Sequence, residues 1–136
     1  MPRLRSHHKS VGICLELLAA RCSKLVAVPM THFFHLDDLA RQRAAKGKLY
    51  LEFLRVPAMS AGVYVLPKGG SDPQKPHSED EMYYVVRGRA RMQIGTEHAE
   101  VRAGSVIFVE AEAEHRFYDI AEELEVLVFF APAEQE

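Results

Sequence analysis

Beyond Gly47 the chain consists of short apolar runs, with no helical segment between one run and the next. Eight of these runs are rich in Val, Ile, Phe or Tyr and are bounded by Gly, Pro, Asp or Ser, which is typical of β-strands. They cover residues 48–56, 61–67, 81–88, 90–95, 99–104, 105–109, 115–120 and 124–132. Because parallel strands need a crossover that is usually helical, this pattern predicts an antiparallel sandwich or jelly-roll barrel.

Local sequence patterns predict which strand side chains share a face, where tight turns fall and where one helix lies. Apolar and polar side chains alternate over residues 89–94, so we expect Ala90, Met92 and Ile94 to share one face. Tight turns are expected at residues 87–89 and 94–96, each centred on a glycine. Apolar residues at helical spacing predict a helix over residues 36–46, with acidic residues at its start and Gly47 at its end.

Composition suits one globular domain. Of the 136 residues, 48% are hydrophobic and 26% are charged, which allows a single buried core without disulfide support. We assign residues 30–136 to this domain. The formal net charge of −2 provides no general attraction to nucleic acid or to anionic membranes, so we expect neither as a partner. The arginines at positions 87, 89 and 91 are interpreted as a solvated strand face.

Residues 1–29 form an extension whose role is left open. They begin basic and continue into an apolar stretch, as a signal peptide does, but Glu16 interrupts that stretch and charged residues follow it. The stretch is also too short and too charged to cross a bilayer. We therefore expect a cytoplasmic protein in which Cys14 and Cys22 are free thiols. The extension is either an amphipathic helix over residues 11–25 or sequence upstream of a functional start at Met30. We expect folding not to depend on it.

Two histidines and a glutamate are the candidate functional residues. His77 and Glu81 follow a loop rich in Pro and Gly, and His115 follows the apolar run at 105–109. Glu81 has the strand parity of Tyr83, so its carboxylate is expected to face inward, where it needs a partner. Two imidazoles and one carboxylate can form a mononuclear metal site if the strands bring them together. The neighbouring Glu79 and Asp80 are interpreted as a solvated acidic turn.

These residues resemble the two motifs of the cupin superfamily. The first motif is written G-x5-H-x-H-x3,4-E-x6-G, and its positions are matched by Gly69, His77, Glu81 and Gly88. The second is a glycine, an apolar strand and a histidine, matched by Gly104, residues 106–109 and His115, with Asp119 where the family often has Asn. The resemblance covers about residues 49–132. It implies an all-β, jelly-roll-like antiparallel cupin barrel with a short N-terminal helix, and it implies a homodimer.

One residue departs from the first motif, because Lys75 stands where the family has its first histidine. An ammonium group does not bind a metal unless it is deprotonated. Three interpretations therefore stay open. His77, Glu81 and His115 hold a metal alone; or Gln74 adds a weak oxygen ligand while Lys75 faces outward; or the site is metal-free and Lys75 contributes positive charge to a ligand pocket.

The resemblance implies a small metal-dependent cupin that acts on a small organic metabolite. The metal would be a divalent first-row ion, Fe, Mn, Ni or Zn, with open coordination positions. A dioxygenase is the first reaction class to expect, ahead of an isomerase or lyase. The alternative is a non-catalytic module that binds a small molecule, as a sensor or binding protein. Tyr64, Tyr83, Phe117 and Lys75 are candidates for the pocket wall, although core packing also explains the three aromatic residues.

Overall fold

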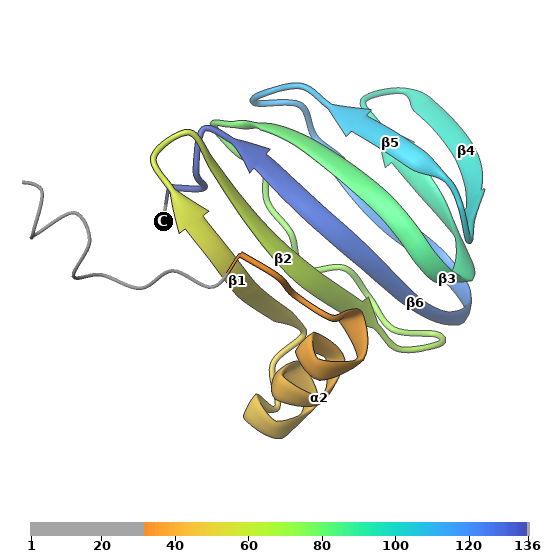
Figure 1. The fold of residues 1–136 in the computed structure, drawn as a ribbon. Coiled ribbons are helices and arrows are strands. Elements are labelled where there is room, and N and C mark those ends of the chain that lie inside the picture. The colour runs from red at the N-terminus through yellow and green to blue at the C-terminus, as the bar shows by residue number, and fades with distance from the viewer. Residues whose placement is uncertain (1–31, 136) are drawn as a thin grey trace, which may run out of the picture. The chain divides into compact units, whose positions relative to one another are not determined.

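The computed structural model of the protein describes residues 32–135, and the expectations for residues 1–29 and both cysteines lie outside the described residues. One helix and six strands follow in chain order (Figure 1). They are α2 (Leu36–Lys46), β1 (Tyr50–Val56), β2 (Met59–Leu66), β3 (Asp80–Ile94), β4 (Glu97–Arg102), β5 (Val106–Val109) and β6 (His115–Ala131). Within this part of the chain no helix is long and apolar enough to span a membrane.

All strand pairings are antiparallel, as expected. The strand order is β1-β2-β6-β3-β4, and β5 also pairs with β3. Strands β3 and β6 pair along their length, from Asp80 opposite Ala131 to Ile94 opposite His115. The first half of β3 lies between β5 and β6, and its second half lies between β4 and β6. The result is an all-β, jelly-roll-like architecture built on one long two-stranded ribbon.

The predicted turn at residues 87–89 is wrong. Gly88 has a φ of 96°, and a Cβ at this position would collide with the Glu123 carbonyl, so the glycine allows a close backbone approach inside a continuous strand. The pairing register shifts three times between Val85 and Arg91. Such irregularities bend a strand instead of ending it. The expected runs at 81–88 and 90–95 are therefore one strand, and those at 115–120 and 124–132 are another.

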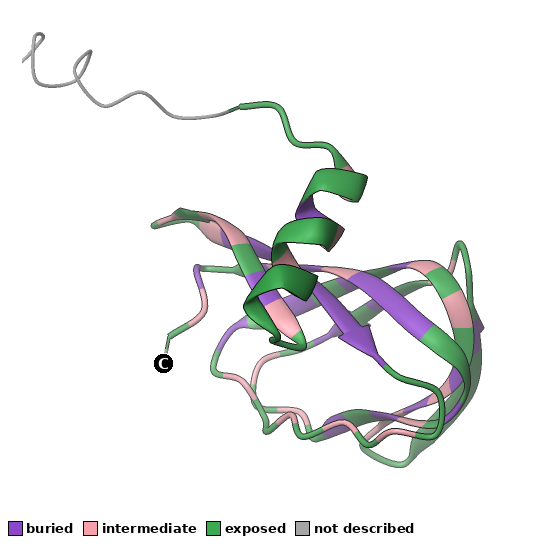
Figure 2. Cartoon of the chain, turned by 90° about the horizontal axis from the view of Figure 1, so that it is seen from below, coloured by how far each residue is buried: buried purple, intermediate pink, exposed green. Residues whose placement is uncertain are grey.

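The turn at residues 94–96 is confirmed, because Ile94 pairs with Glu97 across Gly95. The expected alternation is also present. Ala90 and Met92 are buried and Ile94 is half-buried. In the first half of β3, residues 81, 83 and 85 are buried while residues 82 and 84 are exposed. Buried and exposed stretches alternate along the strands in Figure 2. The inward-facing carboxylate of Glu81 therefore lies in an otherwise apolar layer.

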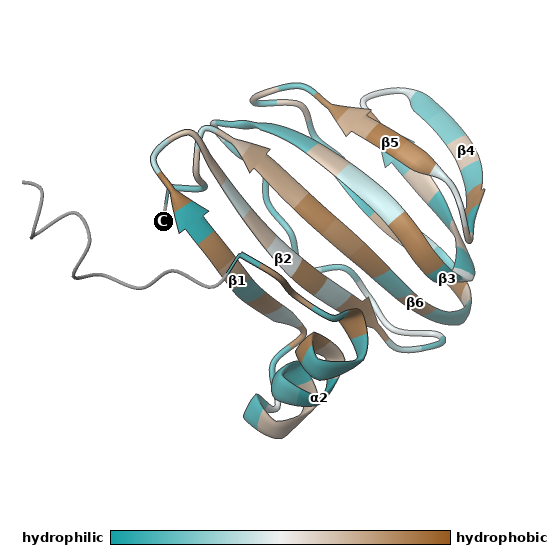
Figure 3. Ribbon diagram, in the orientation of Figure 1, coloured by the Kyte–Doolittle hydropathy of each residue, from teal (hydrophilic) through white to brown (hydrophobic). Residues whose placement is uncertain are grey.

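Helix α2 has the predicted bounds. The His35 side chain accepts the backbone N–H of Asp37 at its start, and Gly47 ends it in the left-handed conformation with a φ of 64°. The helix packs Leu39 against Val63 and Val65 of β2. Hydrophobic residues concentrate along β5 and β6, while much of α2 is hydrophilic (Figure 3). The helix thus covers part of the outer face of the sheet and leaves the interior to the strands.

The alternating arginines of β3 point away from the core. Arg87 pairs with Glu123 and Glu125, each at 2.8 Å. Arg89 lies 4.0 Å from Glu122, and the Nε of Arg91 donates to the Tyr118 hydroxyl at 3.1 Å. Each arginine has a partner on β6, so this face is a paired strand surface.

Candidate metal centre

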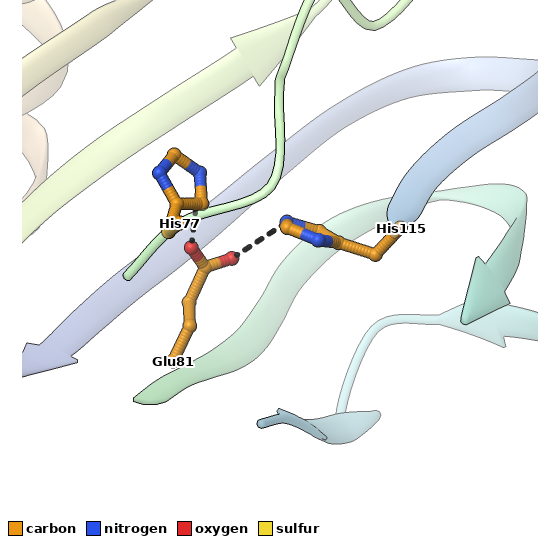
Figure 4. Close-up of side chains that lie close together, drawn as sticks. All are labelled: His77, Glu81 and His115. Carbon is orange, nitrogen blue, oxygen red and sulfur yellow. Dashed lines mark ion pairs between the residues drawn. The ribbon is translucent and has the colours of Figure 1, made fainter. Parts of the chain in front are cut away.

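The side chains of His77, Glu81 and His115 meet inside the fold (Figure 4). One nitrogen or oxygen atom from each residue lies within 4.8 Å of the others. The Glu81 carboxylate stands in the middle, with its Oε2 at 3.5 Å from His77 Nε2 and its Oε1 at 3.4 Å from His115 Nε2. Ligands of one ion, bonded at about 2.0–2.2 Å, are separated by comparable distances.

Glu81 and His115 come from opposite ends of the β3–β6 ribbon. Glu81 is the second residue of β3, and His115 pairs with Ile94, the last residue of β3. A straight strand of this length would hold its ends about 45 Å apart. The side chains meet because the register shifts around Gly88 bend the ribbon back on itself.

Glu81 is 2% exposed. Its burial raises the pKa of the carboxyl, an effect that the two imidazoles oppose and the Glu134 carboxylate supports. A carboxylate without water needs a cation or a hydrogen-bond donor nearby. In the described part of the chain, both of its oxygens are buried without a hydrogen-bond partner.

His115 is held in one orientation. Its Nδ1 lies 2.9 Å from the Ala113 carbonyl, which can only accept, so Nδ1 carries the proton. The lone pair of Nε2 in the neutral ring then points toward Glu81. Burial opposes a charge on the imidazole, but the Glu81 carboxylate and the Ala113 carbonyl outweigh it and raise the pKa of His115.

In this cluster, hydrogen-bond acceptors of Glu81 and of neutral His115 therefore face each other. Both Glu81 oxygens and His115 Nε2 lack a hydrogen-bond partner among the described residues, and His77 Nε2 approaches from the other side. A single proton between His115 and Glu81 would satisfy only the Glu81 oxygen that faces His115. A divalent cation would satisfy all of these atoms together, and a histidine whose second nitrogen donates to a carbonyl is a common form of metal ligand. The donor set fits a metal ion.

The loop before His77 is organised by Asp72. Its carboxylate accepts the Tyr64 hydroxyl at 2.8 Å and the Phe117 N–H at 2.9 Å. It also accepts the backbone and side-chain N–H groups of Gln74 at 3.2 and 2.9 Å. These bonds tie the loop to β2 and β6, and they direct the Gln74 oxygen away from Asp72.

Gln74 and Lys75 point in different directions. The Gln74 Oε1 accepts the Tyr83 hydroxyl at 2.8 Å and lies 3.4 Å from His77 Nε2, so it stands at the edge of the cluster. Lys75 is exposed and lines an open groove of about 470 Å³, which also borders His115 and Arg116. The position of Gln74 agrees with the second interpretation of the sequence, and the position of Lys75 on the groove agrees with the third, so the structure is compatible with both.

The aromatic residues expected in the pocket wall lie in two different places, one beside a cavity and two in the core. Tyr64 lines a second, smaller cavity of about 170 Å³ beside His77. Tyr83 and Phe117 are 0% and 1% exposed and stack edge to face with centroids 5.1 Å apart. Both belong to the core under the cluster, and Tyr83 reaches the site through its hydroxyl.

The interpretation of Glu79 as a solvated residue is wrong. Glu79 is 3% exposed, accepts the Gln135 N–H at 2.7 Å and accepts the Ser78 hydroxyl. It therefore anchors the segment after β6 that carries Glu134, whose carboxylate lies 3.8 Å from His77 Nδ1. Asp80 is exposed, as expected.

Sequence reasoning missed Asp72, Glu134 and Tyr50. Tyr50 lines the smaller cavity with its hydroxyl buried and without a hydrogen-bond partner. Burial, followed by the charge of Glu134, raises the pKa of this phenol. No local motif marks these residues, because each acts on groups brought near by the fold.

Comparison with known proteins agrees with this architecture. A family model described as a cupin domain matches residues 62–130. The uncharacterized protein SCO3923 of Streptomyces coelicolor is 50% identical over 101 residues, which cover 74% of this chain and 96% of the relative.

Solved structures show the same fold at low identity. BH2720 of Bacillus halodurans superposes with a TM-score of 0.66 at 18% identity, covering 78% of this chain and 85% of that one. The cupin domain of Schizosaccharomyces pombe Cnp3 superposes with a TM-score of 0.57 at 16% identity. That match covers 61% of this chain and 63% of the Cnp3 domain, so less than two thirds of the solved chain is spanned. The family model, which matches residues 62–130, shows that the chain belongs to the cupin domain family, and the solved structures agree with it in fold.

Proposed function

We propose that the protein is a mononuclear metal cupin in which His77, Glu81 and His115 hold a divalent first-row ion, Fe, Mn, Ni or Zn. Gln74 adds a fourth, weaker oxygen donor. The observation that carries the proposal is a set of buried atoms without hydrogen-bond partners among the described residues. These atoms are the two Glu81 oxygens and His115 Nε2, and Glu81 Oε1 lies 3.4 Å from His115 Nε2. Buried polar atoms in native proteins normally have partners.

The surrounding residues suit a small organic substrate. His77 borders the smaller cavity and His115 borders the open groove, so the ion would be reached from both sides. A metal with open positions can polarise a bound oxygen atom or, as iron, bind O2, and a dioxygenase is the reaction class we propose first. Tyr83, Gln74 and Asp72 form a hydrogen-bonded chain that keeps the amide oxygen at the site.

A non-catalytic binding module is the second candidate. The groove beside His115 is lined by Lys75 and Arg116 and also by Asp72 and Glu114, and these charges of both signs suit a polar ligand without any reaction. In this case the groove would bind its ligand equally well after the metal is removed.

Metal analysis of the full chain, purified without chelator, tests the proposal. We expect about one first-row ion per chain in the wild type and little in the His77→Ala variant. The control is His98→Ala, because His98 is exposed. In the described part of the chain, the contacts found for its ring are all with Tyr118. Equal and negligible metal in the wild type and in His77→Ala would overturn the metal site. Oxygen uptake by the iron-loaded protein with candidate metabolites then separates the dioxygenase from the binding module.

A further inference from the structure

The cavity of about 170 Å³ beside His77 has a wall unlike that of the open groove. Its lining includes the aromatic rings of Tyr50, Tyr64 and Phe130. The rings of His77 and Phe130 meet edge to face with centroids 4.9 Å apart, and those of Tyr50 and Tyr64 do so at 6.2 Å. We name this space the aromatic chamber. Flat rings on several sides suit a flat, apolar occupant.

The size of the chamber limits its occupant. A cavity of about 150 Å³ with apolar walls is known to admit one benzene ring. The aromatic chamber, at about 170 Å³, therefore holds a single ring or a chain of similar volume. Larger molecules would have to extend out of it.

One polar group of the chamber wall is unsatisfied. The Tyr50 hydroxyl is buried and has no hydrogen-bond partner within residues 32–135, although buried phenols usually have one. The tip of this ring lies over Gly62 of β2, where any Cβ would collide with it. The glycine thus leaves room for the phenol, and the phenol keeps a donor for a group that the protein itself does not supply.

The charge of the chamber excludes anions. Among the residues that the structure describes, no lysine or arginine lines it, whereas the Glu134 carboxylate does. Glu134 is fixed there, because its N–H donates to Ser60 Oγ at 2.9 Å and its carbonyl accepts from Arg55 at 2.8 Å. A ligand carboxylate that reached Tyr50 would be repelled by the charge of Glu134, and the cation beside the chamber would be the ion proposed at His77.

We infer that the aromatic chamber recognises a neutral, single-ring-sized molecule whose hydroxyl or carbonyl oxygen accepts a hydrogen bond from Tyr50. A ligand hydroxyl can in turn donate to Glu134. Tyr50 is then the specificity-determining residue of the site. The inference rests on the proposed function, since it places the substrate of that metal site beside His77.

Three fluorinated probes of one ring test this inference by fluorine NMR titration of the full chain. They are 4-fluorophenol, its near-isostere 4-fluorotoluene and the anion 4-fluorobenzoate. We expect the wild type to bind 4-fluorophenol about tenfold more tightly than 4-fluorotoluene, the effect of one hydrogen bond to a buried donor. In Tyr50→Phe the preference should fall to about twofold or less. Tyr84→Phe is the matched control, because Tyr84 is exposed on the outer face of β3, and it should keep the preference.

Four results would overturn the inference. They are a tenfold preference that survives in Tyr50→Phe, binding of 4-fluorobenzoate as tight as that of 4-fluorophenol, binding of no probe to the wild type, and a preference that disappears after chelator treatment. The last would mean that the metal, not Tyr50, selects the oxygen. Metal content is measured on the same samples. A wild type without metal would refute the proposed function, while the probe ratios would still decide the role of Tyr50.

Discussion

The two histidines of the candidate centre are held in different ways. His115 begins strand β6, its side chain is 1% exposed, and a backbone carbonyl fixes its ring at 2.9 Å. His77 ends a loop, its side chain is 20% exposed, and its polar neighbours Gln74, Glu81 and Glu134 lie at 3.4 to 3.8 Å. One ligand is positioned by the sheet and the other by side chains.

The difference shows how rigidity is divided within the site. The ladder hydrogen bonds of β3 and β6 must break before His115 can move, so its position is as stable as the fold. The position of His77 depends on the Asp72 and Gln74 hydrogen bonds, which can change locally. Substitutions in the loop should therefore alter the metal site while the sheet stays intact.

The largest effect is expected from removing either imidazole. His115→Ala and His77→Ala should each lower metal affinity at least about 100-fold, because each removes one of three principal ligands. In chelator, however, only His115→Ala should lower the free energy of unfolding strongly, by about 2–4 kcal/mol, since it empties a buried site. His77→Ala should change it by less than about 1 kcal/mol. Metal titration and urea unfolding measure the two quantities, and equal destabilisation by both variants would refute the comparison.

Asp72→Asn should loosen the loop without removing the side chain of any proposed metal ligand. The wild-type carboxylate accepts hydrogen bonds from Tyr64, Gln74 and Phe117. The asparagine amide would instead turn its own N–H group toward some of these donors, so those hydrogen bonds would be lost. We expect metal affinity to fall about 10–100-fold, as for other residues that orient metal ligands. Asp80→Asn is the control, because Asp80 is exposed. In the described part of the chain, the hydrogen bond found for its carboxylate comes from the Ala111 N–H at 2.9 Å. Unchanged affinity in Asp72→Asn would show that the loop does not need this support.

Glu134→Gln should have a smaller effect. The carboxylate lies 3.8 Å from His77 Nδ1 and so favours a ring that donates there and coordinates through Nε2. Loss of its charge should weaken metal binding a few-fold and leave the unfolding transition in place. A loss as large as that of His77→Ala would mean that Glu134 is itself a ligand. Competition with a fluorescent zinc chelator measures affinities in this range.

The smallest effect is expected at Lys75. Its side chain is exposed and adds no coordination bond, so Lys75→Ala should keep the wild-type metal content. Lys75→His restores the family pattern and should tighten binding if the loop can turn the new ring inward. Elemental analysis decides the first point and competitive titration the second. Metal lost in Lys75→Ala would contradict the outward position of the ammonium.

The faces of the strands could be predicted from the sequence, because alternation is a local property. Glu81 was placed inward by its parity with Tyr83, and Ala90 and Met92 followed the same rule. The turn expected at Gly88 failed, because a glycine signals both turns and bends, and only the partner strand decides between them. The lengths of β3 and β6 were therefore underestimated.

The support of the site could not be predicted in the same way. Asp72 holds the N–H of Phe117, which lies 45 positions further along the chain. Glu79 holds Gln135 across 56 positions. An acidic residue in a polar loop looks solvated until the folded chain shows which donors surround it. Tyr50 likewise looks like an ordinary strand residue until Gly62 leaves space for its ring.

If the proposed metal binds, the bent β3–β6 ribbon also links its binding to folding. Glu81 and His115 become neighbours only when the whole β3–β6 ladder has formed and curved. In an unfolded or partly paired chain these residues are far apart and form no site. An ion that binds only the native state stabilises it by mass action, by about 2.7 kcal/mol at a free concentration 100 times its dissociation constant. Metal supply would thus set the melting temperature and the lifetime of the protein against proteases, apart from any reaction at the centre.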